Sequence, residues 1–169
     1  MGVAGSNRHG RSRPPPPPPG RGDNGRRGRP NRLVFTIPSD FAAGRQVQKQ
    51  ILEDVQRHGF AGQTFFAINL ALEEALTNAI KHGNRLDPRK KVRIEAKVTA
   101  KQAQITVEDE GEGFDRGGVP DPTAVENLEK CSGRGILLIE AYMSRVTWDR
   151  GGRRVKMVKV NDGPATNKV

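Results

Sequence analysis

The stretch EEALTNAIKHGN at residues 73–84 decides the fold of this chain. Apolar residues recur at helical spacing through it and before it, and Gly83 offers a natural end. We therefore predict a helix over residues 63–82. Glu74 and Asn78 are four residues apart, so they project from one face of this helix, one turn from each other. The buried face is expected to consist of Phe65, Ile68, Leu72, Ala75, Leu76, Ala79 and Ile80.

Further elements are predicted on both sides of this helix. Residues 33–37 favour β structure and stop at Pro38, as an edge strand does. A helix at 40–58 follows, with Ser39 as its N-cap and an apolar stripe at helical spacing. Downstream we expect strands at 91–99 and 103–109, a short apolar helix at 135–142, and closing strands at about 144–149 and 153–160. The fold class is α+β, a two-layer α/β sandwich whose mixed, mostly antiparallel sheet carries the helices on one face.

The 169 residues are enough for one ordinary domain, which we place at 32–161 between two tails. Residues 1–31 are rich in Pro, Gly and Arg, and composition predicts a disordered basic tail. Most of the net charge of +10 lies there. Nucleic acid is therefore an expected partner only through this tail. The alternatives for the tail are an arm that binds an acidic partner, a proline-rich ligand, or a solvated segment without a partner. Residues 162–169 form the C-terminal tail.

One cysteine, Cys131, is present, so no intramolecular disulfide can form. This fits a reducing compartment, and we expect a cytoplasmic protein. No apolar run approaches the roughly 20 residues that span a bilayer, and the basic N-terminus lacks the apolar region of a secretory signal. No membrane association is expected.

Glu74 and Asn78 are suited to chemistry on a phosphate ester. A glutamate can polarise a hydroxyl or a water as a general base. An asparagine offers a neutral oxygen that suits Mg²⁺ bridging phosphates. For an isolated pair at this spacing, a solvated helix face is the alternative.

A second run, VEDEGEGF at residues 107–114, follows a predicted strand. Asp109 ends the strand and can accept a hydrogen bond from an exocyclic amine, as on adenine. Gly111 and Gly113 permit positive φ and close backbone approach. A plain acidic turn is the alternative. Residues 110–132 are long and weakly periodic, and a loop of this length is usually functional or disordered.

A third run, Gly133-Arg134-Gly135-Ile136, opens the last predicted helix. Backbone amides at a helix N-terminus bind anions, and Arg134 adds charge and a bidentate fork. A glycine turn with a surface arginine is the alternative.

Taken together, the three runs resemble the N, G1 and G2 boxes of the Bergerat-fold (GHKL) ATPases, the group that includes gyrase, histidine kinases and MutL. Within that group the chain most resembles the branch of anti-sigma-factor serine/threonine-protein kinases, over roughly residues 32–160. The resemblance implies ATP and Mg²⁺ as ligands. It also implies a sigma factor and an anti-anti-sigma (STAS-type) protein as partners, the latter as the phosphorylated substrate, with a possible homodimer.

The resemblance also assigns roles to individual positions. Glu74 would be the catalytic base and Asn78 the Mg²⁺ ligand. Asp109 would read the adenine amine, and residues 114–132 would be a lid. The remaining nucleotide-binding positions would be Lys81, Gly111, Gly113, Gly133, Arg134 and Gly135.

One position departs from the pattern of some relatives, which carry an arginine just before the Ser-Gly of the G2 turn. This chain reads Lys130-Cys131-Ser132-Gly133 there. The departure bears on how the γ-phosphate is handled, and Arg134 or Lys130 would substitute. The alternative function is a nucleotide-gated protein-binding module with little or no kinase activity.

Overall fold

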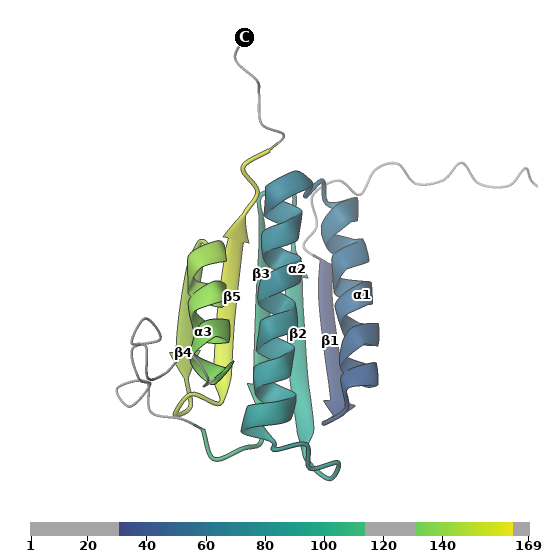
Figure 1. Ribbon diagram of the computed structural model, residues 1–169. Helices are drawn as coiled ribbons and strands as arrows, with labels where there is room; N and C mark the ends of the chain where they lie inside the picture. Colours follow the sequence, from purple (N-terminus) through teal and green to yellow (C-terminus); the bar gives the residue numbers. More distant parts are fainter. Residues whose placement is uncertain (1–30, 114–130, 164–169) are drawn as a thin grey trace, which may run out of the picture.

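The computed structural model describes residues 31–113 and 131–163 of the chain (Figure 1). Its elements are β1 (Asn31–Pro38), α1 (Phe41–Arg57), α2 (Gly62–Thr77), η1 (Asn78–Gly83), β2 (Lys91–Val98), β3 (Gln102–Asp109), α3 (Cys131–Tyr142), β4 (Arg145–Asp149) and β5 (Arg154–Val160). Every predicted helix and strand is present. However, α3 begins at Cys131, four residues before the predicted start, so the run Gly133-Arg134-Gly135 lies within the helix and does not open it. The helix expected over 63–82 begins as an α-helix and ends as the wider π-helical turn η1. Asn31, predicted as the last residue of the tail over 1–31, begins β1. The other residues of that tail, 1–30, and most of the expected lid, 114–130, lie outside the described residues.

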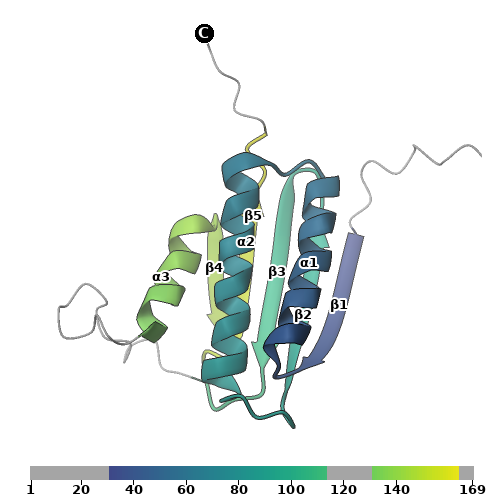
Figure 2. The same ribbon diagram turned by 45° about the vertical axis from the view of Figure 1, so that its right-hand side comes forward.

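The sheet has five strands in the order β1-β2-β3-β5-β4, and each described pairing is antiparallel. The expected two-layer α+β architecture is therefore confirmed, with antiparallel pairing throughout these strands. β1 lies at one edge, as its closing proline predicted. The three α-helices cover one face of the sheet and leave the other uncovered (Figures 1 and 2). Along the described part of the chain, no helix combines the length and apolarity that a membrane crossing requires.

The core lies between these two layers. Residues of α2 and the inward-facing positions of the strands form one apolar cluster. The fully buried large side chains include Ile51, Ile68, Leu72, Ile80, Ile94, Ile105, Ile139 and Met157. Full burial of a side chain of this size contributes about 1.5–3 kcal/mol relative to exposure. The seven residues expected on the inner face of the long helix all belong to the cluster or pack against it.

The N-cap of α1 is Asp40, not Ser39 as the sequence predicted. The Asp40 carboxylate accepts a hydrogen bond of 2.8 Å from the Ala43 backbone N–H. Ser39 is buried instead, and its hydroxyl donates to the Lys90 carbonyl at 3.1 Å. Both residue types are good caps, and the long-range contact with Lys90 decides which one is used.

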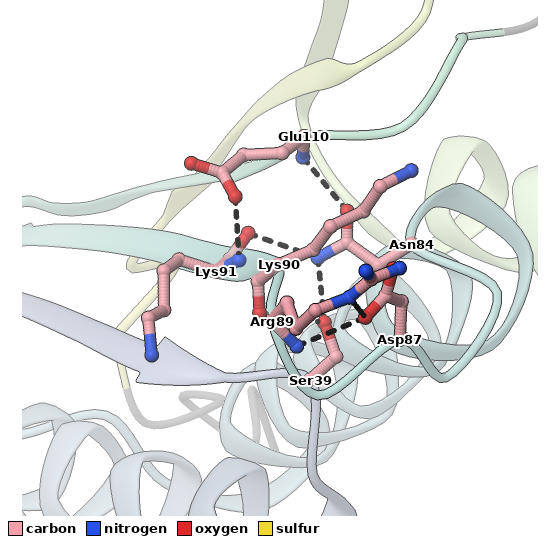
Figure 3. A network of polar contacts seen from close by, with 7 residues as sticks. All are labelled: Ser39, Asn84, Asp87, Arg89, Lys90, Lys91 and Glu110. Carbon is pink, nitrogen blue, oxygen red and sulfur yellow. Dashed lines mark hydrogen bonds and ion pairs between the residues drawn. The ribbon is translucent and has the colours of Figure 1, made fainter.

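A buried asparagine, Asn84, joins the end of η1 to three strands (Figure 3). Its Nδ2 donates to Ser39 Oγ at 2.7 Å and to the Lys91 carbonyl at 2.9 Å. Its Oδ1 accepts from the Glu110 backbone N–H at 2.8 Å. The side chain thus ties the ends of β1 and β3 to the start of β2, and it fixes the residue that follows Asp109.

Candidate functional site

The change from α-helix to π-helix falls at Asn78, the asparagine singled out in the sequence. Glu74 lies in the last turn of α2, and Asn78 opens η1. A π-helical turn inside a longer helix is rare and is frequent at functional sites. The wider turn carries residues 78–83 over the end of β3, with which η1 is in contact.

A cavity of about 280 Å³ opens beside this turn. Its walls come from the end of α2, from η1, from the start of α3, from the end of β3 and from the β4–β5 hairpin. The lining residues are Ala75, Asn78, Ala79, His82, Gly83, Val107, Asp109, Gly113, Ile136, Trp148, Gly152, Arg153 and Val155. Most of these are apolar or glycine, with a few polar groups among them, which is typical of a small-molecule site.

Asp109 is the acidic group of this cavity. Its Oδ1 accepts a hydrogen bond of 2.8 Å from the Gly111 backbone N–H. Burial raises the pKa of the Asp109 carboxyl above its ordinary value, while the Gly111 hydrogen bond and the charge of Arg153 act in the opposite direction. A carboxylate oxygen in a partly buried apolar cavity is a strong acceptor for a ligand N–H.

Glycines allow the two predicted runs to meet at Asp109. A Cβ on Gly83 would lie 2.5 Å from Asp109 Oδ1. A Cβ on Gly111 would collide with the Gly83 carbonyl, and one on Gly113 with the Gly151 carbonyl. Gly113 also has a φ of +81°, which favours glycine. Close packing and backbone conformation therefore explain these residues without any appeal to a ligand.

The third run meets the first at Glu74. A Cβ on Gly135 would lie 2.6 Å from Glu74 Oε2 and 3.5 Å from both side-chain polar atoms of Asn78. Asn78 Nδ2 is buried and has no hydrogen-bond partner among the described residues. A buried donor without a partner costs about 1–3 kcal/mol, so its presence on a cavity wall indicates a ligand acceptor.

The predicted site residues separate into two groups. Glu74, Asn78, Asp109, Gly111, Gly113 and Gly135 lie in the cavity wall or directly behind it. Lys81 and Arg134 have exposed side chains and do not line the cavity, and Gly133 lies in the first turn of α3. The roles assigned to all nine positions stay predictions.

Several wall residues were not predicted. Trp148, Gly152 and Arg153 come from the β4–β5 hairpin, and Ile136 comes from α3. Trp148 packs against the core and also lines the cavity. No local motif marks Arg153. Its place follows from the β3–β5 register, which sets the hairpin beside Asp109.

His82 was expected only to end the helix, and it lies in the cavity wall. Partial burial lowers the pKa of its imidazole below the ordinary value of 6.5, and the neighbouring Lys81 lowers it further. The imidazole is therefore mainly neutral at pH 7, and it brings a hydrogen-bonding group without a full charge.

Comparisons with known proteins bear on the family and the fold of the chain. Residues 37–159 match the model of the histidine kinase-like ATPase domain. The chain is 36% identical over 101 residues to an anti-sigma F factor of Clostridium perfringens, covering 71% of that protein and 56% of this chain. It is 38% identical over 82 residues to an anti-sigma F factor of Oceanobacillus iheyensis, covering 56% of that protein and 47% of this chain.

A solved structure has the same fold. The crystal structure of the RsbU and RsbW domains of a Mycobacterium tuberculosis protein matches with a TM-score of 0.54 at 19% identity. The match covers 78% of this chain and 32% of that longer chain. With the family model spanning most of the described residues, the chain belongs to the histidine kinase-like ATPase domain family.

Proposed function

We propose that this protein is an ATP-binding anti-sigma factor and serine/threonine-protein kinase that phosphorylates an anti-anti-sigma protein of the STAS type and so controls sigma-factor availability. Family membership implies ATP binding. The anti-sigma F factor relatives support the regulatory role. The observation that carries the catalytic part is the packing of Gly135 against the Glu74 carboxylate beside the Asn78 amide. This packing supports the proposal because it brings the assigned base and the assigned metal ligand together beside α3.

The residues present fit a nucleotide with its magnesium ion. The cavity is apolar enough for a purine, and Asp109 offers an acceptor for an exocyclic amine. Asn78 also lines the cavity, with a buried amide nitrogen that has no acceptor among the described residues. Its Oδ1 would hold Mg²⁺, and its Nδ2 would donate to an oxygen of the ligand.

Each side chain then has a defined task in phosphoryl transfer. ATP supplies the γ-phosphoryl group. Glu74 would accept the proton of the substrate serine or threonine hydroxyl as that oxygen bonds to the γ-phosphorus, while the bond from this phosphorus to the β–γ bridging oxygen breaks and ADP leaves. In the part of the chain that the structure describes, its carboxylate forms no ion pair or hydrogen bond that would compete for this proton. Arg134 and Lys81, both exposed near this end, would contribute positive charge toward the phosphates.

The test compares Glu74→Ala with Glu73→Ala. Glu73 is the exposed neighbour, so its variant removes the same charge one residue away. Mg-ATP binding is followed by the fluorescence of Trp148, the single tryptophan, which lines the cavity. Transfer is measured with radiolabelled ATP and a purified STAS-type protein encoded beside a sigma factor in the same genome.

We expect Glu74→Ala to bind Mg-ATP within about threefold of wild type and to lose at least 10²-fold in transfer, as removal of a general base does. Glu73→Ala should retain both. Transfer that persists in Glu74→Ala would rule out the assigned base. A wild-type protein that binds Mg-ATP and holds its partner without transfer would instead identify a nucleotide-gated binding module.

A further inference from the structure

Arg153 is held beside Asp109 at the end of the cavity where the base would lie. It stands in the turn between β4 and β5, and its backbone carbonyl accepts the Asp109 N–H at 3.0 Å. Its Cγ is 3.2 Å from the position that a Cβ on Gly113 would take. These contacts place the stem of Arg153 on the Asp109 side of the cavity, whereas Glu74 and Gly135 meet at the phosphate side.

A second arginine in the same turn holds the hairpin from the other face. Glu108 and Asp109 follow each other in β3, so their side chains point to opposite faces of the sheet. The Glu108 carboxylate accepts from Arg150 Nη1 at 2.5 Å on the uncovered face. Arg153 Nε donates to the Arg150 carbonyl at 3.0 Å, and Arg153 lines the cavity.

The terminal amino groups of Arg153 have no acceptor among the residues that the structure describes. A guanidinium held by one nitrogen, with its flat face and remaining donors exposed, is well suited to stack on an aromatic ring. The cavity is also lined by the apolar side chains of Val107, Trp148 and Val155. A purine in this cavity would therefore meet both apolar side chains and a cation.

We propose that Arg153 is a nucleotide-binding residue that contacts the purine base of the nucleotide, not its phosphates. The inference rests on the proposed function, since it assumes that an adenine nucleotide occupies this cavity. It adds a base contact from the β4–β5 hairpin to the single carboxylate contact expected at Asp109. Its consequence is that the loss of Arg153 weakens every ligand that carries the base, whatever its number of phosphates.

The experiment measures the affinity of Arg153→Ala for adenosine, ADP and ATP with Mg²⁺, by calorimetry and by Trp148 fluorescence. Arg154→Ala is the matched control, because it removes the same charge at the adjacent position. Arg154 lines the groove on the uncovered face of the sheet together with Glu108. Arg153→Gln is a second variant, which removes the charge but keeps an amide donor for the Arg150 carbonyl. Circular dichroism checks that each variant is folded.

We expect Arg153→Ala to weaken all three ligands by a common factor of roughly 5 to 30, with Arg153→Gln also weakened and Arg154→Ala unchanged. A loss that grows from adenosine to ATP would overturn the inference, because it would make Arg153 a phosphate contact. Equal affinity in wild type and both Arg153 variants would overturn it as well. Failure of the wild-type protein to bind any of the three ligands would instead overturn the proposed function.

Discussion

Replacement of Asn84 by alanine should destabilise the whole domain, because one buried side chain connects η1 to three strand ends. Asn84 is fully buried, and its amide makes three hydrogen bonds, to Ser39, Lys91 and Glu110 (Figure 3). At about 1 kcal/mol net for each, their loss costs about 3 kcal/mol. The Glu110 N–H and the Lys91 carbonyl would also lose a partner in a half-buried place, which raises the expected cost to about 3–5 kcal/mol. A domain of this size is stable by about 5–15 kcal/mol, so the loss is a large fraction of the total.

The assay is equilibrium unfolding in urea, followed by Trp148 fluorescence and by circular dichroism. Ser39→Ala is the matched variant, since it removes one of the three partners, and we expect it to cost about 1–2 kcal/mol. The loss of unfolding free energy in the double variant should be smaller than the sum of the two single losses by about 1 kcal/mol. The reason is that each single variant already removes the Asn84–Ser39 hydrogen bond. A loss below about 1 kcal/mol in Asn84→Ala, or additivity in the double variant, would refute the network as a source of stability.

Two other substitutions test the site. Gly135→Ala places a Cβ 2.6 Å from Glu74 Oε2, so the carboxylate must move. We expect the rate of phosphoryl transfer to fall about 10²-fold, as it does when a reacting group is misplaced by about 1 Å. A wild-type rate would show that Glu74 tolerates the shift. Asp109→Asn should raise the melting temperature of the nucleotide-free protein at pH 7, because burial raises the pKa of Asp109 and its ionised form therefore opposes folding above that pKa. The gain should vanish as the pH falls below the ordinary carboxyl pKa of 3.8, where the carboxyl is protonated in both states; a gain that is independent of pH would contradict the assignment.

Much of the fold could be predicted because its signals are local. The stripe of apolar residues through 63–82 follows the period of a helix, and the alternation in 91–99 and 103–109 follows the period of a strand. Gly111 and Gly113 predicted a close approach of the backbone. The structure confirms it, because the carbonyl oxygens of Gly83 and Gly151 lie where Cβ atoms on these two glycines would be. Such patterns depend on neighbours in the sequence, so they can be read without the fold.

The helix ends and caps were less predictable, since they depend on distant partners. The π-helical turn at Asn78 has no signal in the local sequence. The choice of Asp40 over Ser39 as N-cap follows from the contacts of Ser39 with Lys90 and Asn84. Those partners lie 51 and 45 residues away along the chain.

The sequence by itself determined the order of the three motifs, the α+β class and the residue types that chemistry on a phosphate ester needs. Only the tertiary structure decided which of those residues share a cavity and what completes its wall. Glu74 meets Gly135 across two helices, and Arg153 reaches Asp109 through the register of β5 on β3. The physical reason is that helix and strand periods are fixed within a few residues, whereas a cavity wall is assembled by packing between segments that the chain alone does not bring together.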